Sequence, residues 1–242
     1  MKRLILLMIT CYCLLPGHAN TDIASDSLLQ VLQTLPHDTT RLSTLNDIIK
    51  IEQNNYKCIQ YSDTLMQEAL KLKNDKYASL AAYYHLLYYY NRSEQDSVAK
   101  WIVRMEPYVQ RSGLWDYFFD AQRFQIDLYT FTEQYELAIS EANKMKQKAL
   151  NTNSNRGTVA AYQCLSNAYI GSQRWDEGLK ALEEAYRLLP KKGNAVVHIS
   201  VLSQLISVTK EMKDNNRQLK YLQELESVLR KFIIDNPSLK DG

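Results

Sequence analysis

The chain has 242 residues, of which 45% are hydrophobic and 23% are charged. This composition is typical of a folded globular protein and excludes a disordered or membrane-embedded one. Only 7 Gly and 5 Pro occur, and Leu, Ala, Lys, Glu and Gln are abundant, which favours helices. No persistent runs of Val, Ile and Thr separate turn signals, as β or α/β folds would require. We therefore predict an all-α protein.

The first residues have the pattern of a secretory signal peptide. The start is positively charged, residues 4–15 are apolar, and Ala19 offers a small residue for cleavage. The apolar run is shorter than the roughly 20 residues that cross a bilayer. We predict a leader at 1–19, export to the periplasm, and one mature domain at 20–242. A buried N-terminal helix is the alternative interpretation.

Export changes the charge of the chain. The sequence has 29 basic and 27 acidic side chains, and loss of Lys2 and Arg3 leaves 27 of each. A neutral mature chain gives no electrostatic reason to expect nucleic acid or anionic lipid as a partner. The mature cysteines, Cys58 and Cys164, are about 100 residues apart in an elongated array, so we expect two buried thiols and no disulfide.

Helical periodicity continues through the chain. A short helix is expected at 25–35, ended by Pro36. Ten further helices are expected in five pairs: 39–53 with 55–73, 75–91 with 95–111, 114–131 with 134–150, 156–171 with 175–189, and 194–212 with 215–235. Each pair has an apolar face that it cannot bury alone, so the pairs are expected to stack into a solenoid.

A repeat is visible at 159–190, "VAAYQCLSNAYIGSQRWDEGLKALEEAYRLLP". Large residues and Ser166 follow a helical face, a polar turn leads to Trp175, and a second helix carries the small residue Gly178. Matching positions of the five second helices recur with gaps of 41, 39, 40 and 40: Cys58, Ala99, Ala138, Gly178 and Gln218. The regular gaps predict a repeat of about 40 residues.

This pattern resembles the tetratricopeptide repeat, although Ser166 stands where Gly is usual and Gly178 where Ala is usual. Because Ala is usual there, Gly178→Ala is expected to be tolerated or stabilising. The resemblance implies an all-α, right-handed solenoid of about five antiparallel helix pairs, whose first helices line a concave, peptide-binding face. A HEAT-like pairing, with a period nearer 40, is the alternative fold.

A candidate binding surface starts in the tyrosine-rich stretch "AAYYHLLYYYNR" at 81–92. By the offsets of the repeat, the concave face receives ten residues: Tyr84, Tyr88, Asn91, Asp120, Arg123, Asp127, Gln163, Asn167, Ser203 and Ser207. Amides, hydroxyls and charges flanked by two rings suit hydrogen bonds to a peptide. Two other interpretations remain: a solvated helix face, or a local ion network of Asp120, Arg123 and Asp127.

The sequence shows no pattern of an active site. His37, His85 and His198 are far apart, and no Cys or carboxylate lies one helical turn away to complete a zinc site. Phosphate-binding loops and hydrolase motifs do not occur. We therefore expect a chain without catalytic residues, cofactor or metal; an enzyme of unknown type is a remote alternative.

The leader, the segment "DSLLQVLQTLPHDTTRL" at 26–42 and the repeats together resemble exported sensor regions of bacterial histidine kinases and related transcriptional regulators. The resemblance implies a periplasmic two-component sensor that binds a protein, a peptide or a second copy of itself. Those sensors continue into a transmembrane helix, so membrane attachment is expected only through a C-terminal segment missing from this sequence. A freestanding periplasmic adaptor for envelope proteins is the alternative.

Overall fold

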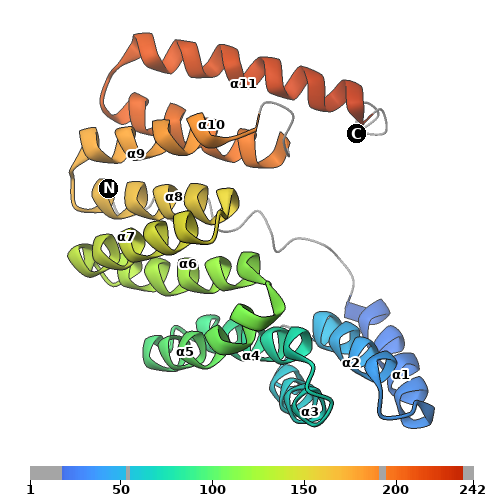
Figure 1. Cartoon of the computed structure of the whole chain (residues 1–242). Coiled ribbons are helices and arrows are strands. Elements are labelled where there is room, and N and C mark those ends of the chain that lie inside the picture. The colour runs from blue at the N-terminus through green and yellow to red at the C-terminus, as the bar shows by residue number, and fades with distance from the viewer. Residues whose placement is uncertain (1–17, 53–54, 191–194, 237–242) are drawn as a thin grey trace.

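A computed structural model describes residues 18–52, 55–190 and 195–236, with side chains from residue 25 onwards. These ranges contain eleven α-helices and no strand (Figure 1). The helices are α1 His18–Thr34, α2 Thr39–Glu52, α3 Lys57–Lys71, α4 Asp75–Tyr90, α5 Gln95–Ser112, α6 Trp115–Phe131, α7 Tyr135–Asn151, α8 Asn155–Gly171, α9 Trp175–Leu188, α10 Ala195–Glu211 and α11 Asn215–Asp235. The predicted all-α solenoid is confirmed.

Helices α2 to α11 begin and end within two residues of the predicted limits. The first helix differs, because α1 begins at His18 and not at residue 25. Residues 18–34 contain neither Gly nor Pro, so nothing in the sequence interrupts a helix there. Residues 1–17 of the predicted leader lie outside the described residues.

The eight helices from α4 to α11 follow a constant spacing. They begin at residues 75, 95, 115, 135, 155, 175, 195 and 215, so each helix with its turn occupies 20 residues. A left-handed residue stands two positions before most of these starts: Lys73, Ser93, Gly113, Glu133, Asn153, Gln173 and Lys213. The full repeat of the structure is therefore 40 residues, divided into two equal halves.

A recurring hydrogen bond keeps most of these turns short. The N–H of Gln134 donates to the carbonyl of Tyr129 at 2.8 Å, and the N–H of Arg174 donates to that of Tyr169 at 2.8 Å. This bond across six residues closes a helix end of the Schellman type around a left-handed residue. The donor itself is the N-cap of the next helix. One short turn thus ends one helix and begins the next.

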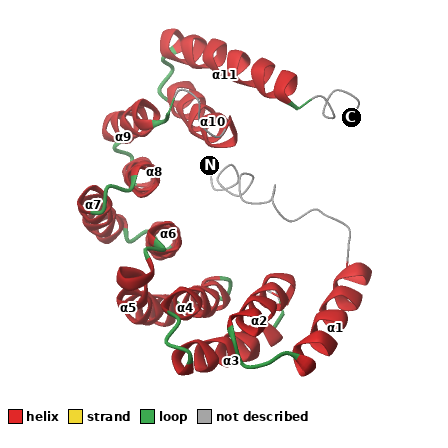
Figure 2. Ribbon diagram, turned by 45° about the vertical axis from the view of Figure 1, so that its right-hand side comes forward, coloured by secondary structure: helices red, strands yellow, loops and turns green. Residues whose placement is uncertain are grey.

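Each helix packs on its successor, and the first helices α2, α4, α6 and α8 also pack on one another. This second set of contacts draws the first helices together, so the array curves with them on the inside (Figure 2). The outer helices α3, α5, α7, α9 and α11 form the convex side. Three successive apolar clusters make up the core along the array.

The repeat register differs from the sequence prediction at one position. Val98, Ala138, Gly178 and Gln218 are each the fourth residue of an outer helix. Val98 is fully buried whereas Ala99 is half-buried. A search for small residues selects Ala99, but the packing position belongs to its larger neighbour.

Candidate functional site

The 40-residue repeat aligns two rows of side chains along the inner helices. We call these eight residues the inner stripe: Tyr83, Arg123, Gln163 and Ser203 in one row, and Leu87, Asp127, Asn167 and Ser207 in the other. None of them is fully buried. On α6, Arg123 and Asp127 lie opposite the buried Phe118 and Ala121, and so face away from the outer helices. Six of the ten predicted residues belong to the stripe.

Tyr84 was expected on the concave surface, and the structure places it in the core. Its side chain is 4% exposed, and its hydroxyl donates to Oδ1 of Asn46 in α2 at 3.0 Å. Burial raises the pKa of this hydroxyl. The 40-residue repeat aligns Tyr83, and not Tyr84, with Arg123. The prediction on α4 was therefore displaced by one residue, about 100° around the helix.

Tyr88 and Asn91 also lie outside the inner stripe. Tyr88 is half-buried, with the Arg92 guanidinium 3.5 Å from its ring centroid and the Tyr89 ring at 5.4 Å in an edge contact. Asn91 is exposed and is the C-cap of α4. Both therefore lie at the C-terminal end of α4.

Asp120 joins two inner helices. Its carboxylate accepts a hydrogen bond from Nη2 of Arg156 in α8 at 2.7 Å, and its side chain is 21% exposed. Burial raises the pKa of this carboxyl, opposed by the charges of Arg156 and Arg123. Asp120 therefore stabilises the contact between α6 and α8 beside the stripe.

Arg123 and Asp127 form the charged centre of the stripe. Within the described ranges, Arg123 has no ion pair with either aspartate, and its buried Nε has no hydrogen-bond partner. The guanidinium lies 5.1 Å from the centroid of the Phe124 ring. Burial raises the pKa of Asp127 to about 6, although the charge of Arg123 lowers it. Among the described residues the local ion network considered from sequence is therefore absent, and no carboxylate of the chain pairs with Arg123.

Aromatic rings flank this centre. Phe124 packs against Tyr90 with centroids 4.5 Å apart, and Tyr83 meets Tyr117 edge-on at 5.0 Å. These contacts hold α4 against α6. They give Arg123 an apolar and rigid setting in which an ionic contact is stronger than in water.

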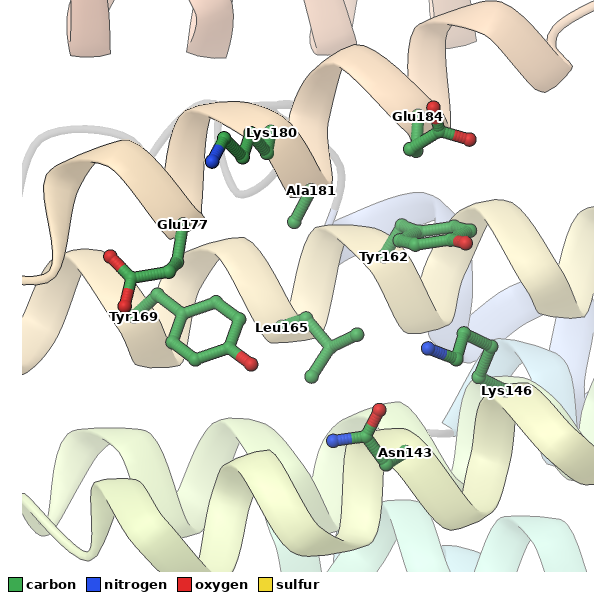
Figure 3. A pocket seen from close by; sticks show the side chains of 9 residues that line it. All are labelled: Asn143, Lys146, Tyr162, Leu165, Tyr169, Glu177, Lys180, Ala181 and Glu184. Atoms are coloured by element: carbon green, nitrogen blue, oxygen red, sulfur yellow. The ribbon is translucent and has the colours of Figure 1, made fainter.

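A second concavity, which we call the outer groove, lies on the convex side between α7 and α9 and is floored by α8. Its cavity volume is about 240 Å³. The lining residues are Asn143, Lys146, Tyr162, Leu165, Tyr169, Glu177, Lys180, Ala181 and Glu184. Figure 3 shows the rings of Tyr162 and Tyr169 on either side of Leu165, with Ala181 facing the same space. Sequence reasoning missed this groove because it considered only the concave side.

Aromatic side chains occupy the corresponding place between α3 and α5. The buried His85 ring stacks on Trp101 with centroids 4.0 Å apart and planes 2° from parallel. His85 Nε2 is 3.1 Å from Oδ1 of Asp63, without the alignment of a hydrogen bond. Burial lowers the pKa of His85, opposed by Asp63. The Arg104 guanidinium lies 4.5 Å from the Trp101 centroid.

Other chemistry is not indicated in the described part of the chain. It contains no group of three or more His, Cys, Asp or Glu placed to hold a metal ion. Cys58 and Cys164 are buried and free, and burial raises the pKa of both thiols, which disfavours the reactive thiolate. None of the helices placed here is both long and apolar enough to span a bilayer.

Comparisons with known proteins show the fold alone. No family model matches the chain, and no curated protein matches its sequence. Among solved structures, the chain is similar to BtubC (BKLC) from P. vanneervenii, with a TM-score of 0.61 and 13% sequence identity. The match covers 88% of this chain and 90% of that one. It supports a helical repeat architecture over nearly the whole length.

Proposed function

We propose that the chain is a tetratricopeptide-like, non-catalytic interaction module whose inner stripe binds an extended segment of a partner protein. The observation that carries this proposal is Arg123, a half-buried guanidinium that has no ion pair within the described residues and lies beside the Phe124 ring on the inner surface. A ligand carboxylate would pair with this guanidinium through a charge-assisted hydrogen bond.

The stripe changes its chemistry from repeat to repeat. It offers the largely apolar Tyr83 and Leu87 on α4, the charged pair on α6, amides on α8 and hydroxyls on α10. Such an order favours an extended ligand that carries first an apolar side chain, then a carboxylate, and then main-chain groups available for hydrogen bonds. A freestanding adaptor and a sensor both require this property, and so does binding to a second copy of the chain.

The test is a display library of ten-residue peptides selected on the full chain, followed by titration of the selected peptides. Arg123→Gln is expected to weaken peptides that carry a carboxylate at a common position by at least about tenfold, equivalent to 1.4 kcal/mol. Arg230→Gln, on the exposed face of α11, is the control and should leave affinity unchanged. Equal affinities for wild type and Arg123→Gln would reject the inner stripe as the binding site.

We further propose that the module is exported and forms the periplasmic sensor part of a transmembrane signalling protein. The leader-like pattern at 1–19 and the resemblance of 26–42 to such sensors support this location. Cell fractionation with an antibody to the module tests it. A band much larger than 28.1 kDa in the membrane fraction is expected. A soluble periplasmic band near that mass would favour the adaptor, and a cytoplasmic band would contradict export.

A further inference from the structure

We propose that the outer groove is a docking site for a tryptophan side chain carried by a partner polypeptide. This site is separate from the inner stripe, because it lies between the outer helices α7 and α9. The inference comes from comparing the same position in successive repeats.

The constant spacing makes this comparison direct, because the start of α8 lies 80 residues after that of α4, and α9 follows α5 by the same interval. Leu165 therefore corresponds to His85, and Ala181 corresponds to Trp101. In the N-terminal repeat, Trp101 extends from α5 and its indole lies parallel on the His85 ring at 4.0 Å. In the outer groove the same helix positions carry Leu165 and Ala181, and a cavity of about 240 Å³ lies against them where the N-terminal repeat has the indole.

The intermediate groove, between α5 and α7, is filled differently. Gln125 stands at the position of Leu165, and its amide donates to the Tyr129 hydroxyl at 2.7 Å. Glu141 stands at the position of Ala181 and forms an ion pair with Lys144 at 2.7 Å. Polar side chains pair with one another there, so that groove lacks the apolar floor of the outer groove.

The walls of the outer groove suit an indole. Leu165 and Ala181 provide an apolar floor, only 4% and 6% exposed, and Tyr162 and Tyr169 flank it for ring contacts. Glu177 and Glu184 stand on the rim with side chains 45% and 42% exposed. Either carboxylate can accept the indole N–H, the one polar group of the side chain.

The ligand is a tryptophan from another protein, since the tryptophans of this chain are already used in packing. Trp101 and Trp115 pack against the central apolar cluster, and Trp175 packs against the C-terminal one. Release of any of them would open the core of the solenoid. A partner that presents tryptophan on an exposed segment would reproduce between α7 and α9 the contact that Trp101 makes between α3 and α5.

The probe for the test is N-acetyl-L-tryptophanamide, titrated into the full chain with labelled leucine and alanine methyl groups. In NMR spectra of the wild-type protein, the chemical shifts of the Leu165 and Ala181 methyl groups are expected to change saturably with probe concentration. N-acetyl-L-leucinamide is the control ligand and should bind at least about tenfold more weakly, because it lacks the flat ring and the N–H. Equal binding of the two, or shifts confined to other leucines, would overturn the proposal without any variant.

Substitutions give a second readout. Ala181→Trp should fill the groove from within and abolish the shifts at Leu165. Glu141→Trp places the same side chain at the same helix position one repeat earlier, and should leave binding unchanged within about twofold. If folded Ala181→Trp, judged by circular dichroism, still binds the probe, the groove is not the site. If that variant does not fold, the wild-type mapping alone decides.

Discussion

Gln173 has a left-handed backbone, with φ of 64°, in the turn before α9. Six side-chain-bearing residues adopt this conformation in the described chain, and a seventh left-handed turn position is taken by Gly113. A side chain with Cβ is strained there, and glycine is not. The regular turns of the solenoid therefore carry local strain that the helix-end hydrogen bonds overcome.

Gln173→Gly is expected to stabilise the fold by about 0.5–1 kcal/mol, because it removes this strain from an exposed turn. The matched control is Gln147→Gly, at an exposed position inside α7, which should destabilise by about 1 kcal/mol. Urea unfolding of both variants measures the difference. A loss of stability in Gln173→Gly would show that the left-handed backbone at Gln173 does not destabilise the folded state.

The packing around Gly178 argues against the prediction that Gly178→Ala is tolerated or stabilising. A Cβ at this position would lie 2.6 Å from Cγ1 of Ile170 and 3.3 Å from the Ser166 carbonyl oxygen. The first atom belongs to a β-branched side chain with little freedom. We expect Gly178→Ala to destabilise by about 1–3 kcal/mol through overpacking. Combining it with Ile170→Ala should recover part of that loss in a double-mutant cycle, and strict additivity would exclude this contact as the cause.

Asp127 makes stability depend on pH. Its pKa is raised to about 6 in the folded state, against about 3.9 for a free aspartate. The folded state therefore binds the proton more tightly, so this contribution to stability is present below pH 4 and is lost as pH rises through 6. The other groups that share this environment are Arg123, Tyr90 and Cys164; burial raises the pKa of Tyr90 to about 12 and that of the Cys164 thiol well above normal.

Asp127→Asn should abolish this dependence. Unfolding in urea at pH 4, 5, 6 and 7 should show the variant gaining on the wild type as pH rises, with most of the change between pH 4 and 6. Asp176→Asn, at an exposed position of α9, is the control. Its free energy of unfolding relative to the wild type should not rise between pH 4 and 6. A constant difference for Asp127→Asn would mean that Asp127 is solvated like a surface carboxylate.

At the scale of the element, the same helix position contributes differently to folding stability along the array. Leu182 of α9 and Leu222 of α11 are equivalent, since their helices begin at 175 and 215. Leu182 is 1% exposed and packs in the C-terminal cluster, whereas Leu222 is 44% exposed. In α11 only Tyr221 is buried. The same residue type therefore packs in one helix and faces outward in the next.

Leu182→Ala is expected to cost about 2–5 kcal/mol, as in other well-packed cores. Leu222→Ala should cost less than about 1 kcal/mol because little contact is lost. Thermal unfolding of the two variants tests this ranking. A large loss for Leu222→Ala at low protein concentration would mean that α11 is covered in solution, and its dependence on protein concentration would identify a second copy as the cover.

For the whole molecule, the 20-residue half-repeat sets which changes of length the solenoid tolerates. Deletion of 135–174 removes one full repeat and joins the N-cap Gln134 directly to Trp175. We expect this variant to remain helical and to unfold cooperatively at a lower temperature, since one stacking interface is lost. Deletion of 135–172 leaves two extra residues in the turn and should be markedly less stable. Equal melting temperatures for the two deletion variants would show that the length of the turn does not determine how the helices pack.

The sequence by itself determined the limits of α2 to α11 and the repeat, but not the start of α1. These features depend on local interactions: turn residues, N-caps and apolar periodicity act within one or two turns of chain. It also predicted the position of six of the ten candidate residues on the inner stripe, because on α6, α8 and α10 the polar residues of the stripe contrast with apolar neighbours. On α4 that contrast fails, since rings occur at both Tyr83 and Tyr84.

Only the tertiary structure decided which of those rings is buried. Tyr84 lies in the core because Asn46, 38 residues earlier, accepts its hydroxyl, and no local pattern encodes that pairing. The outer groove likewise depends on residues that are distant in sequence. Ala181 is small at the helix position where Trp101 stands two repeats earlier. Free space depends on the volumes of residues brought together from α7, α8 and α9, and that sum is fixed only when the helices pack.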